Sequence, residues 1–160
     1  MGFQRLVRVV GIIQALAVSF LPLSALADVV LTVHKPLTET TTFTMEQLRQ
    51  FPEISFKTTT PWTDGEQRFV GVALHDVLGE VSSSDTISLR AVNDYVVNMP
   101  ASEVATEFPV VAYERNGSAM SVRDKGPLWL IYPFDDNLEF RTETIFSRSI
   151  WQLVEITVGH

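Results

Sequence analysis

Apolar and polar residues alternate along several short segments of this chain, a pattern typical of β-strands with one buried face. In the segment 54–60, Ile54, Phe56 and Thr58 fall on one side of the predicted strand and the intervening residues fall on the other. The same alternation, or a short apolar run, predicts further strands at 29–34, 86–89, 95–99, 110–114, 119–122, 128–132 and 150–158. The apolar run 69–72 is placed to dock on the core that these strands form.

Turn-forming residues separate many of these segments. Asn116-Gly117 is the strongest hairpin signal in the chain, because both residue types tolerate the left-handed conformation of a two-residue turn. Asn93-Asp94 predicts a second hairpin, and Asp64-Gly65 predicts a turn before the run 69–72. The chain therefore reads as strands joined by tight connections, with no internal repeat and no linker.

Helices are expected to be few and short. Thr44 and Gln47 have the spacing of a capping box, for a helix that stops before Pro52. Helical spacing over 74–78 predicts a second helix that ends at Gly79. Because strands outnumber helices, the predicted fold class is α+β with a mostly β core and short helices.

The first 27 residues have the layout of a secretory signal peptide. Arg5 and Arg8 precede an apolar run, which closes with the small-residue motif Ala25-Leu26-Ala27. A retained membrane anchor is the alternative, but the run is short for a spanning helix. We therefore expect cleavage after Ala27, one mature domain over 28–160 in the periplasm or outside the cell, and no membrane span after cleavage.

Composition removes several classes of function. The chain has a net charge of −7, and loss of the two leader arginines would make it −9, which argues against a nucleic-acid partner. It contains no cysteine, which excludes thiolate nucleophiles and iron–sulfur clusters. Its three histidines, His34, His75 and His160, lack zinc-site spacing. We therefore expect no metal held by protein side chains.

Few segments carry candidate chemistry. No serine-hydrolase elbow and no glycine-rich phosphate loop occurs. Asp135-Asp136 can cap a turn or hold a cation. The segment 123–127, Arg-Asp-Lys-Gly-Pro, places two cations and a glycine before an apolar strand, where they can hold an anion. The alternative interpretation of this segment is an ordinary charged turn.

Four longer motifs follow the tryptophan-containing loop in a defined order. They are F-x-G-V-x-L-x-D-V-L at 69–78, N-D-Y-x-V-x-M-P at 93–100, D-K-G-P-L-W-L-I-Y-P at 124–133 and W-Q-L-x-x-I-x-V at 151–158. In this order they resemble the molybdopterin-binding domain of the sulfite oxidase family, in particular its small, exported, single-domain, oxidoreductase-like members. The resemblance covers nearly all of 28–160 and implies a mixed α+β fold with a compact β core.

The chain departs from this resemblance at two positions. In catalytic members of the family a cysteine thiolate binds molybdenum, commonly four residues before a tryptophan, and counting back from Trp62 gives Thr58. A neutral hydroxyl is a hard donor and does not replace a soft thiolate without a large change in affinity. Family members also often carry an arginine that supports the anionic cofactor, at the position where this chain has Trp129.

These departures lead to two main hypotheses. The favoured one is a non-catalytic small-ligand-binding, sensory or accessory module without a cofactor, whose partner is a small organic anion or a periplasmic sensor protein. Its pocket would be lined by Thr58, Thr60, Trp62, Tyr95, Arg123 and Lys125. The alternative is a molybdopterin-dependent oxidoreductase in which the pterin dithiolene supplies the sulfur ligands, with threonine or water completing the site. A structural subunit of a larger complex is a third interpretation.

Overall fold

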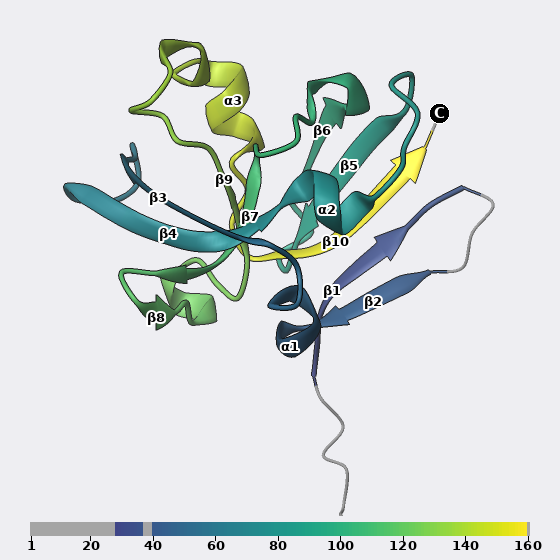
Figure 1. Cartoon of the computed structure of the whole chain (residues 1–160), viewed down its shortest axis with the longest axis horizontal. Coiled ribbons are helices and arrows are strands. Elements are labelled where there is room, and N and C mark those ends of the chain that lie inside the picture. Colours follow the sequence, from purple (N-terminus) through teal and green to yellow (C-terminus); the bar gives the residue numbers. More distant parts are fainter. Residues whose placement is uncertain (1–27, 37–39, 160) are drawn as a thin grey trace, which may run out of the picture.

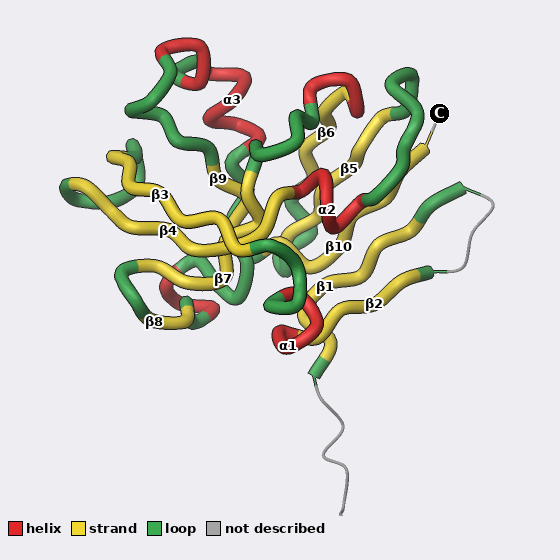
Figure 2. The backbone as a smooth tube through the Cα atoms, in the orientation of Figure 1, coloured by secondary structure: helices red, strands yellow, loops and turns green. Residues whose placement is uncertain are grey.

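The computed structural model describes residues 28–36 and 40–159. These residues form two β-sheets accompanied by short helices (Figure 1), and far more of the backbone is strand than helix (Figure 2). The expected signal peptide at 1–27 lies outside the described residues. Within the described ranges, no helix has both the length and the apolar character needed to cross a bilayer.

Sheet A joins the two ends of the described chain. Its strand order is β2-β1-β10-β5-β6. β1 and β10 pair in parallel, whereas the other neighbours pair antiparallel. The first and last strands therefore lie side by side within one sheet, as Figure 1 shows. The strands of sheet A are β1 (Val29–His34), β2 (Thr41–Thr44), β5 (Thr86–Ala91), β6 (Val96–Pro100) and β10 (Leu153–Gly159).

Sheet B is built around its central strand β7. The order is β3-β4-β7-β8, and β9 also pairs with β7. The predicted hairpin at Asn116-Gly117 is confirmed: both residues have positive φ, 53° and 79°, as a tight two-residue turn requires. The strands are β3 (Glu53–Thr59), β4 (Glu66–Ala73), β7 (Val110–Arg115), β8 (Ser118–Ala119) and β9 (Trp129–Ile131).

Three α-helices are present in the described ranges, and each is short: α1 (Met45–Leu48), α2 (Leu74–Leu78) and α3 (Glu143–Arg148). The predicted capping box is confirmed at α1, where Thr44 and Gln47 each accept a backbone hydrogen bond from the other. The predicted stop of α2 at Gly79 is also confirmed, since that glycine has a φ of 59°.

Both faces of sheet B are covered, which explains its continuous apolar runs. Along β9 and its flanks, Leu128 and Leu130 pack into the core shared with sheet A, whereas Trp129 and Ile131 pack into a second cluster on the opposite face. The second cluster is rich in aromatic side chains from β4, β9 and the segments around α3. Sheet B is therefore the middle layer, and the aromatic cluster lies on its outer side.

Four elements differ from the sequence prediction. The last strand begins at Leu153 and not at residue 150, because Gln152 has a φ of 54° and interrupts the extended backbone. The strand predicted at 119–122 ends at Ala119, since Val122 opens a short 3₁₀ helix, Val122–Asp124. β2 and α3 were not predicted: β2 is too polar to show alternation, and α3 is too short to show helical periodicity.

Candidate functional site

Thr58, the position of the expected metal ligand, is part of the packed interior of the protein. Its side chain is 0% exposed at the end of β3. The hydroxyl accepts a 3.1 Å hydrogen bond from the backbone amide of Asp135 and donates one of 3.2 Å to the carbonyl of Thr59. The hydroxyl thus links β3 to the loop after β9 through a hydrogen bond.

Asp135 completes this connection from the other side. Its carboxylate accepts hydrogen bonds from the backbone amide and the hydroxyl of Thr59, and it forms an ion pair of 2.6 Å with Arg141. The pKa of the Asp135 carboxyl is lowered, chiefly by the hydrogen bond from the Thr59 amide, and also by the Thr59 hydroxyl and Arg141. The Asp135 carboxylate therefore ties the loop after β9 to the end of β3 and to Arg141.

A polar pocket of about 390 Å³ lies beside Trp62, in the loop between β3 and β4. Three cations line it, Arg115 from the end of β7 and Arg123 and Lys125 from the segment before β9. The remaining lining residues are Thr63, Asp64, Gln67 and Asp124. The charged turn predicted at 123–127 therefore faces the tryptophan loop across a pocket.

The three cations of this pocket are not neutralised by ion pairs. The other arginines and lysines of residues 28–36 and 40–159 mostly bind a carboxylate, as Arg49, Lys57, Arg90, Arg141 and Arg148 do. Within the same ranges, no salt bridge involves Arg115, Arg123 or Lys125. The Asp124 carboxylate, a possible local counter-charge, accepts a 3.3 Å hydrogen bond from Ser121.

Backbone geometry places Lys125 against the aromatic cluster. Lys125 has a φ of 71°, and its carbonyl accepts a 3.1 Å hydrogen bond from the amide of Gln152. Its ammonium nitrogen lies 4.2 Å from the ring centre of Trp151 and 5.7 Å from that of Trp129. This cation–π contact holds the positive charge at the border between polar and aromatic surfaces.

An apolar pocket of about 450 Å³ also lies beside Trp62. Aromatic side chains form much of its wall: Trp62, Tyr95, Phe146 and Trp151. Polar groups contribute less, through Asn93, Ser147 and Ser149. Trp62 is therefore the one side chain shared by the apolar pocket and the polar pocket.

Of the six site residues predicted from the sequence, four line one or both pockets and two line neither. Tyr95 lines the apolar pocket, Arg123 and Lys125 line the polar pocket, and Trp62 lines both. Thr58 differs from the expectation because it is fully buried, and it lines neither pocket. Thr60 also lines neither: its hydroxyl accepts from the Trp62 amide at 3.1 Å and contacts the Thr63 hydroxyl at 2.8 Å, so it shapes the loop.

Arg115 and Phe146 are among the contributors to the site that sequence reasoning missed. Arg115 ends β7 next to the Asn116-Gly117 turn, so the hairpin signal placed it near a loop, but nothing in the sequence indicated which loop it faces. Phe146 lies on α3, the helix that gave no periodic signal. Both residues reach the site through tertiary packing of segments that are distant in the sequence.

Neither departure from the family pattern leaves a place for a molybdenum ligand. The Thr58 hydroxyl is consumed by two hydrogen bonds in the interior. Trp129, at the position of the expected arginine, is 0% exposed, and its indole donates a 3.1 Å hydrogen bond to the carbonyl of Ser149. Within the described residues, no cluster of histidine and carboxylate side chains has a metal-binding arrangement. The side chains at these positions do not fit a protein-ligated molybdenum centre.

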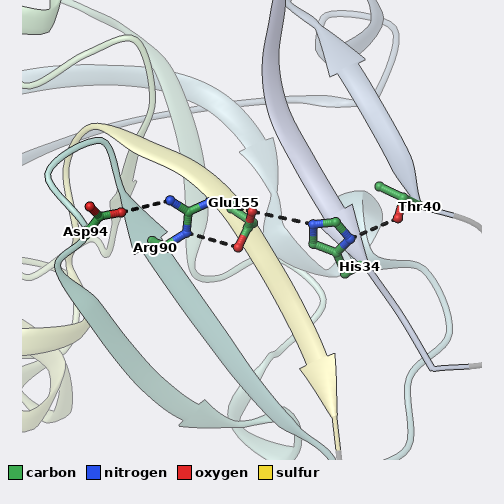
Figure 3. Close-up of polar contacts among 5 residues, drawn as sticks. All are labelled: His34, Thr40, Arg90, Asp94 and Glu155. Atoms are coloured by element: carbon green, nitrogen blue, oxygen red, sulfur yellow. Dashed lines mark hydrogen bonds and ion pairs between the residues drawn. The ribbon is translucent and has the colours of Figure 1, made fainter.

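A separate chain of polar contacts crosses sheet A (Figure 3). Glu155 on β10 binds Arg90 on β5 through two hydrogen bonds and lies 3.5 Å from the imidazole of His34 on β1. Arg90 also binds Asp94, and His34 binds Thr40. None of these five side chains lines either pocket, so the arrangement links strands and lies outside the candidate site.

Comparison with known proteins yields a structural likeness only. No protein-family model matches the chain, and no curated protein is significantly similar to it. The crystal structure of the sulfane dehydrogenase SoxCD from Paracoccus pantotrophus matches 80% of this chain with a TM-score of 0.59 at 17% sequence identity. The match spans 37% of the length of that chain. This protein therefore shares the fold of part of that chain, in agreement with the α+β fold class expected from the sequence.

Proposed function

We propose that the protein is an exported ligand-binding module, with a sensory or accessory role, that holds a small organic anion in the polar pocket. One observation carries the proposal: Arg115, Arg123 and Lys125 converge on one pocket without forming a salt bridge to any described residue. Cations beside a low-dielectric aromatic wall attract a carboxylate more strongly than cations in open water.

The polar pocket has more cations than carboxylates, although the chain as a whole is acidic. The whole chain carries −7, yet three cations face two carboxylates, Asp64 and Asp124, in the polar pocket. Charges beyond about 8–10 Å are largely screened at physiological salt, so a bound anion responds mainly to these near neighbours. Backbone hydrogen bonds within 121–126 fix the turn that presents Arg123 and Lys125, and this limits the entropy lost on binding.

Calorimetric titration with succinate and with succinamide tests the proposal, because the two probes differ mainly in charge. We expect succinate to bind and succinamide to bind at least tenfold more weakly, equivalent to about 1.4 kcal/mol. Arg123→Gln should weaken succinate by about 1.5–3 kcal/mol if it donates a charge-assisted hydrogen bond. Equal binding of both probes, or no binding of succinate, would contradict the proposal.

Arg68→Gln is the matched control for Arg123→Gln. Arg68 is also an exposed arginine, on β4, but its guanidinium binds the Ser55 hydroxyl at 3.0 Å and it lines neither pocket. Its replacement should leave the succinate affinity unchanged. Equal losses in the two variants would indicate a general effect of net charge and not a site.

Metal analysis separates this proposal from the oxidoreductase alternative. The protein would be purified from the exported fraction of a host that makes molybdopterin, and molybdenum would be measured by mass spectrometry. We expect no stoichiometric molybdenum, because the Thr58 hydroxyl is already hydrogen-bonded within the interior. One molybdenum per chain would favour the oxidoreductase. Amino-terminal sequencing of the same material should begin at Asp28; a start at Met1 would count against export.

A further inference from the structure

The polar pocket and the apolar pocket together have the composition of a two-part site. Trp62 lines both pockets, so they meet at this residue and a ligand that spans it would contact both. The apolar pocket, at about 450 Å³, lies within the usual size range of small-molecule sites. Its lining joins aromatic residues from four segments: the β3–β4 loop, the β5–β6 hairpin, α3 and the stretch between α3 and β10.

The walls of the apolar pocket suit a flat, apolar occupant. Trp62 and Trp151 meet edge to face, with ring centres 5.7 Å apart, and Phe146 meets Trp62 in the same manner at 5.9 Å. Tyr95 is 51% exposed although it is large and aromatic. An aromatic ligand would stack on such rings and cover Tyr95, and aromatic pairs contribute free energy beyond the burial of their area.

Lys125 determines the charge that such a ligand should carry. It lines the polar pocket, yet its ammonium lies over the ring of Trp151, which is a wall of the apolar pocket. An acidic group attached to a ring in the apolar pocket would therefore find Lys125 at the boundary, with Arg123 and Arg115 beyond it. A cationic ligand would meet repulsion, and a neutral one would leave these charges without a partner.

We propose that the ligand is a planar aromatic anion, a carboxylate or sulfonate of one or two rings, with its ring in the apolar pocket and its acidic group held by Lys125 and Arg123. This inference rests on the proposed anion-binding function and specifies the body of the ligand. Trp62 would contact both parts of the ligand, because it is the residue that lines both pockets.

The experiment compares three probes by calorimetry: 2-naphthoate carries ring and anion, succinate carries anions only, and 2-naphthylmethanol carries the ring only. We expect 2-naphthoate to bind at least about tenfold more tightly than either of the others. Similar affinities for succinate and 2-naphthoate would overturn the aromatic inference while the proposed anion-binding function stands. Failure of both anions to bind would overturn the proposed function itself. Equal binding of 2-naphthylmethanol and 2-naphthoate would overturn the requirement for an anion.

Two variants test which residue contacts the ring of the ligand and which one binds its acidic group. Tyr95→Ala should weaken 2-naphthoate by about tenfold and leave succinate unchanged, since half-exposed Tyr95 lines only the apolar pocket. Lys125→Gln should weaken both anions by about tenfold. Lys35→Gln is the control, because Lys35 forms no salt bridge with a described residue and lines neither pocket.

Phe146→Leu is a milder change in the same pocket, for the case that Tyr95→Ala does not fold. It keeps an apolar side chain on α3 but removes an aromatic wall of the apolar pocket. It should weaken 2-naphthoate several-fold and spare succinate, and thermal unfolding would verify that each variant is folded. If neither Tyr95→Ala nor Phe146→Leu changes the affinity for 2-naphthoate, the ring does not lie in the apolar pocket and the inference is wrong.

Discussion

The guanidinium of Arg148 lies against the carboxylate of Glu103, and this ion pair joins α3 to the 3₁₀ helix Ala101–Glu103 after β6. Arg148 is nearly buried, with a side chain 11% exposed, whereas Glu103 is 44% exposed. A buried guanidinium that loses its partner keeps its desolvation cost without compensation. The pair therefore holds α3, and with it Phe146, at the wall of the apolar pocket.

Glu103→Gln should lower the free energy of unfolding by about 1–3 kcal/mol, because it leaves the buried charge of Arg148 without a carboxylate. Urea unfolding measures this loss. Glu66→Gln is the control: it removes the partner of Lys57 from a pair whose side chains are 56% and 65% exposed. That change should stay within about 0.5 kcal/mol. Equal losses in the two variants would show that burial of Arg148 contributes nothing.

The absence of cysteine allows a direct test of the position of Thr58. In Thr58→Cys the only thiol would lie in the interior, whereas in Thr63→Cys it would line the polar pocket. We expect Ellman's reagent to label Thr58→Cys more than about tenfold more slowly under native conditions, because labelling requires local opening. The two variants should react equally in urea. Rapid native labelling of Thr58→Cys would mean that this position faces solvent.

Asp135 should contribute to acid sensitivity. Its carboxyl pKa is lowered in the folded protein, chiefly by the Thr59 amide, so the unfolded chain binds the proton more readily. The stabilisation is complete above the unfolded-state pKa of about 3.9 and is lost as the pH falls through the lower folded-state value. Asp135→Asn should therefore be less stable at pH 7 and lose less stability than the wild type on acidification below about pH 5. Urea unfolding of both proteins across this pH range measures the difference.

Replacement of Phe69 tests how much the aromatic cluster on the outer side of sheet B contributes to stability. It is 0% exposed on β4, and its ring meets that of Trp129 edge to face at 5.3 Å. Phe69→Ala should reduce the free energy of unfolding by about 3–5 kcal/mol, since it leaves a large cavity in a packed cluster. Leu138→Ala, at a side chain that is 77% exposed, should change it by less than about 0.5 kcal/mol. A small effect at Phe69 would indicate that the cluster can collapse onto the vacated space.

Local patterns in the sequence determined much of the secondary structure. The capping box at Thr44 and Gln47, the stop at Gly79 and the Asn116-Gly117 turn depend on neighbouring residues, so they could be predicted from short segments. Alternation along 54–60 likewise placed Thr58 on the same side of the strand as Ile54 and Phe56, and this proves to be the more buried side. The excess of strands over helices predicted the α+β fold class, and the structural likeness to part of the sulfane dehydrogenase supports it.

Tertiary structure alone decided which residues form the site. The hydroxyl of Thr58 meets an amide 77 residues away, and this contact removes it from any pocket. Trp62 and Lys125 are brought to the same border because β4, β7 and β9 lie together in sheet B. A sequence specifies propensity and periodicity over a few residues. The direction in which a loop side chain points depends on the packing of segments that are distant along the chain, and no local pattern encodes it.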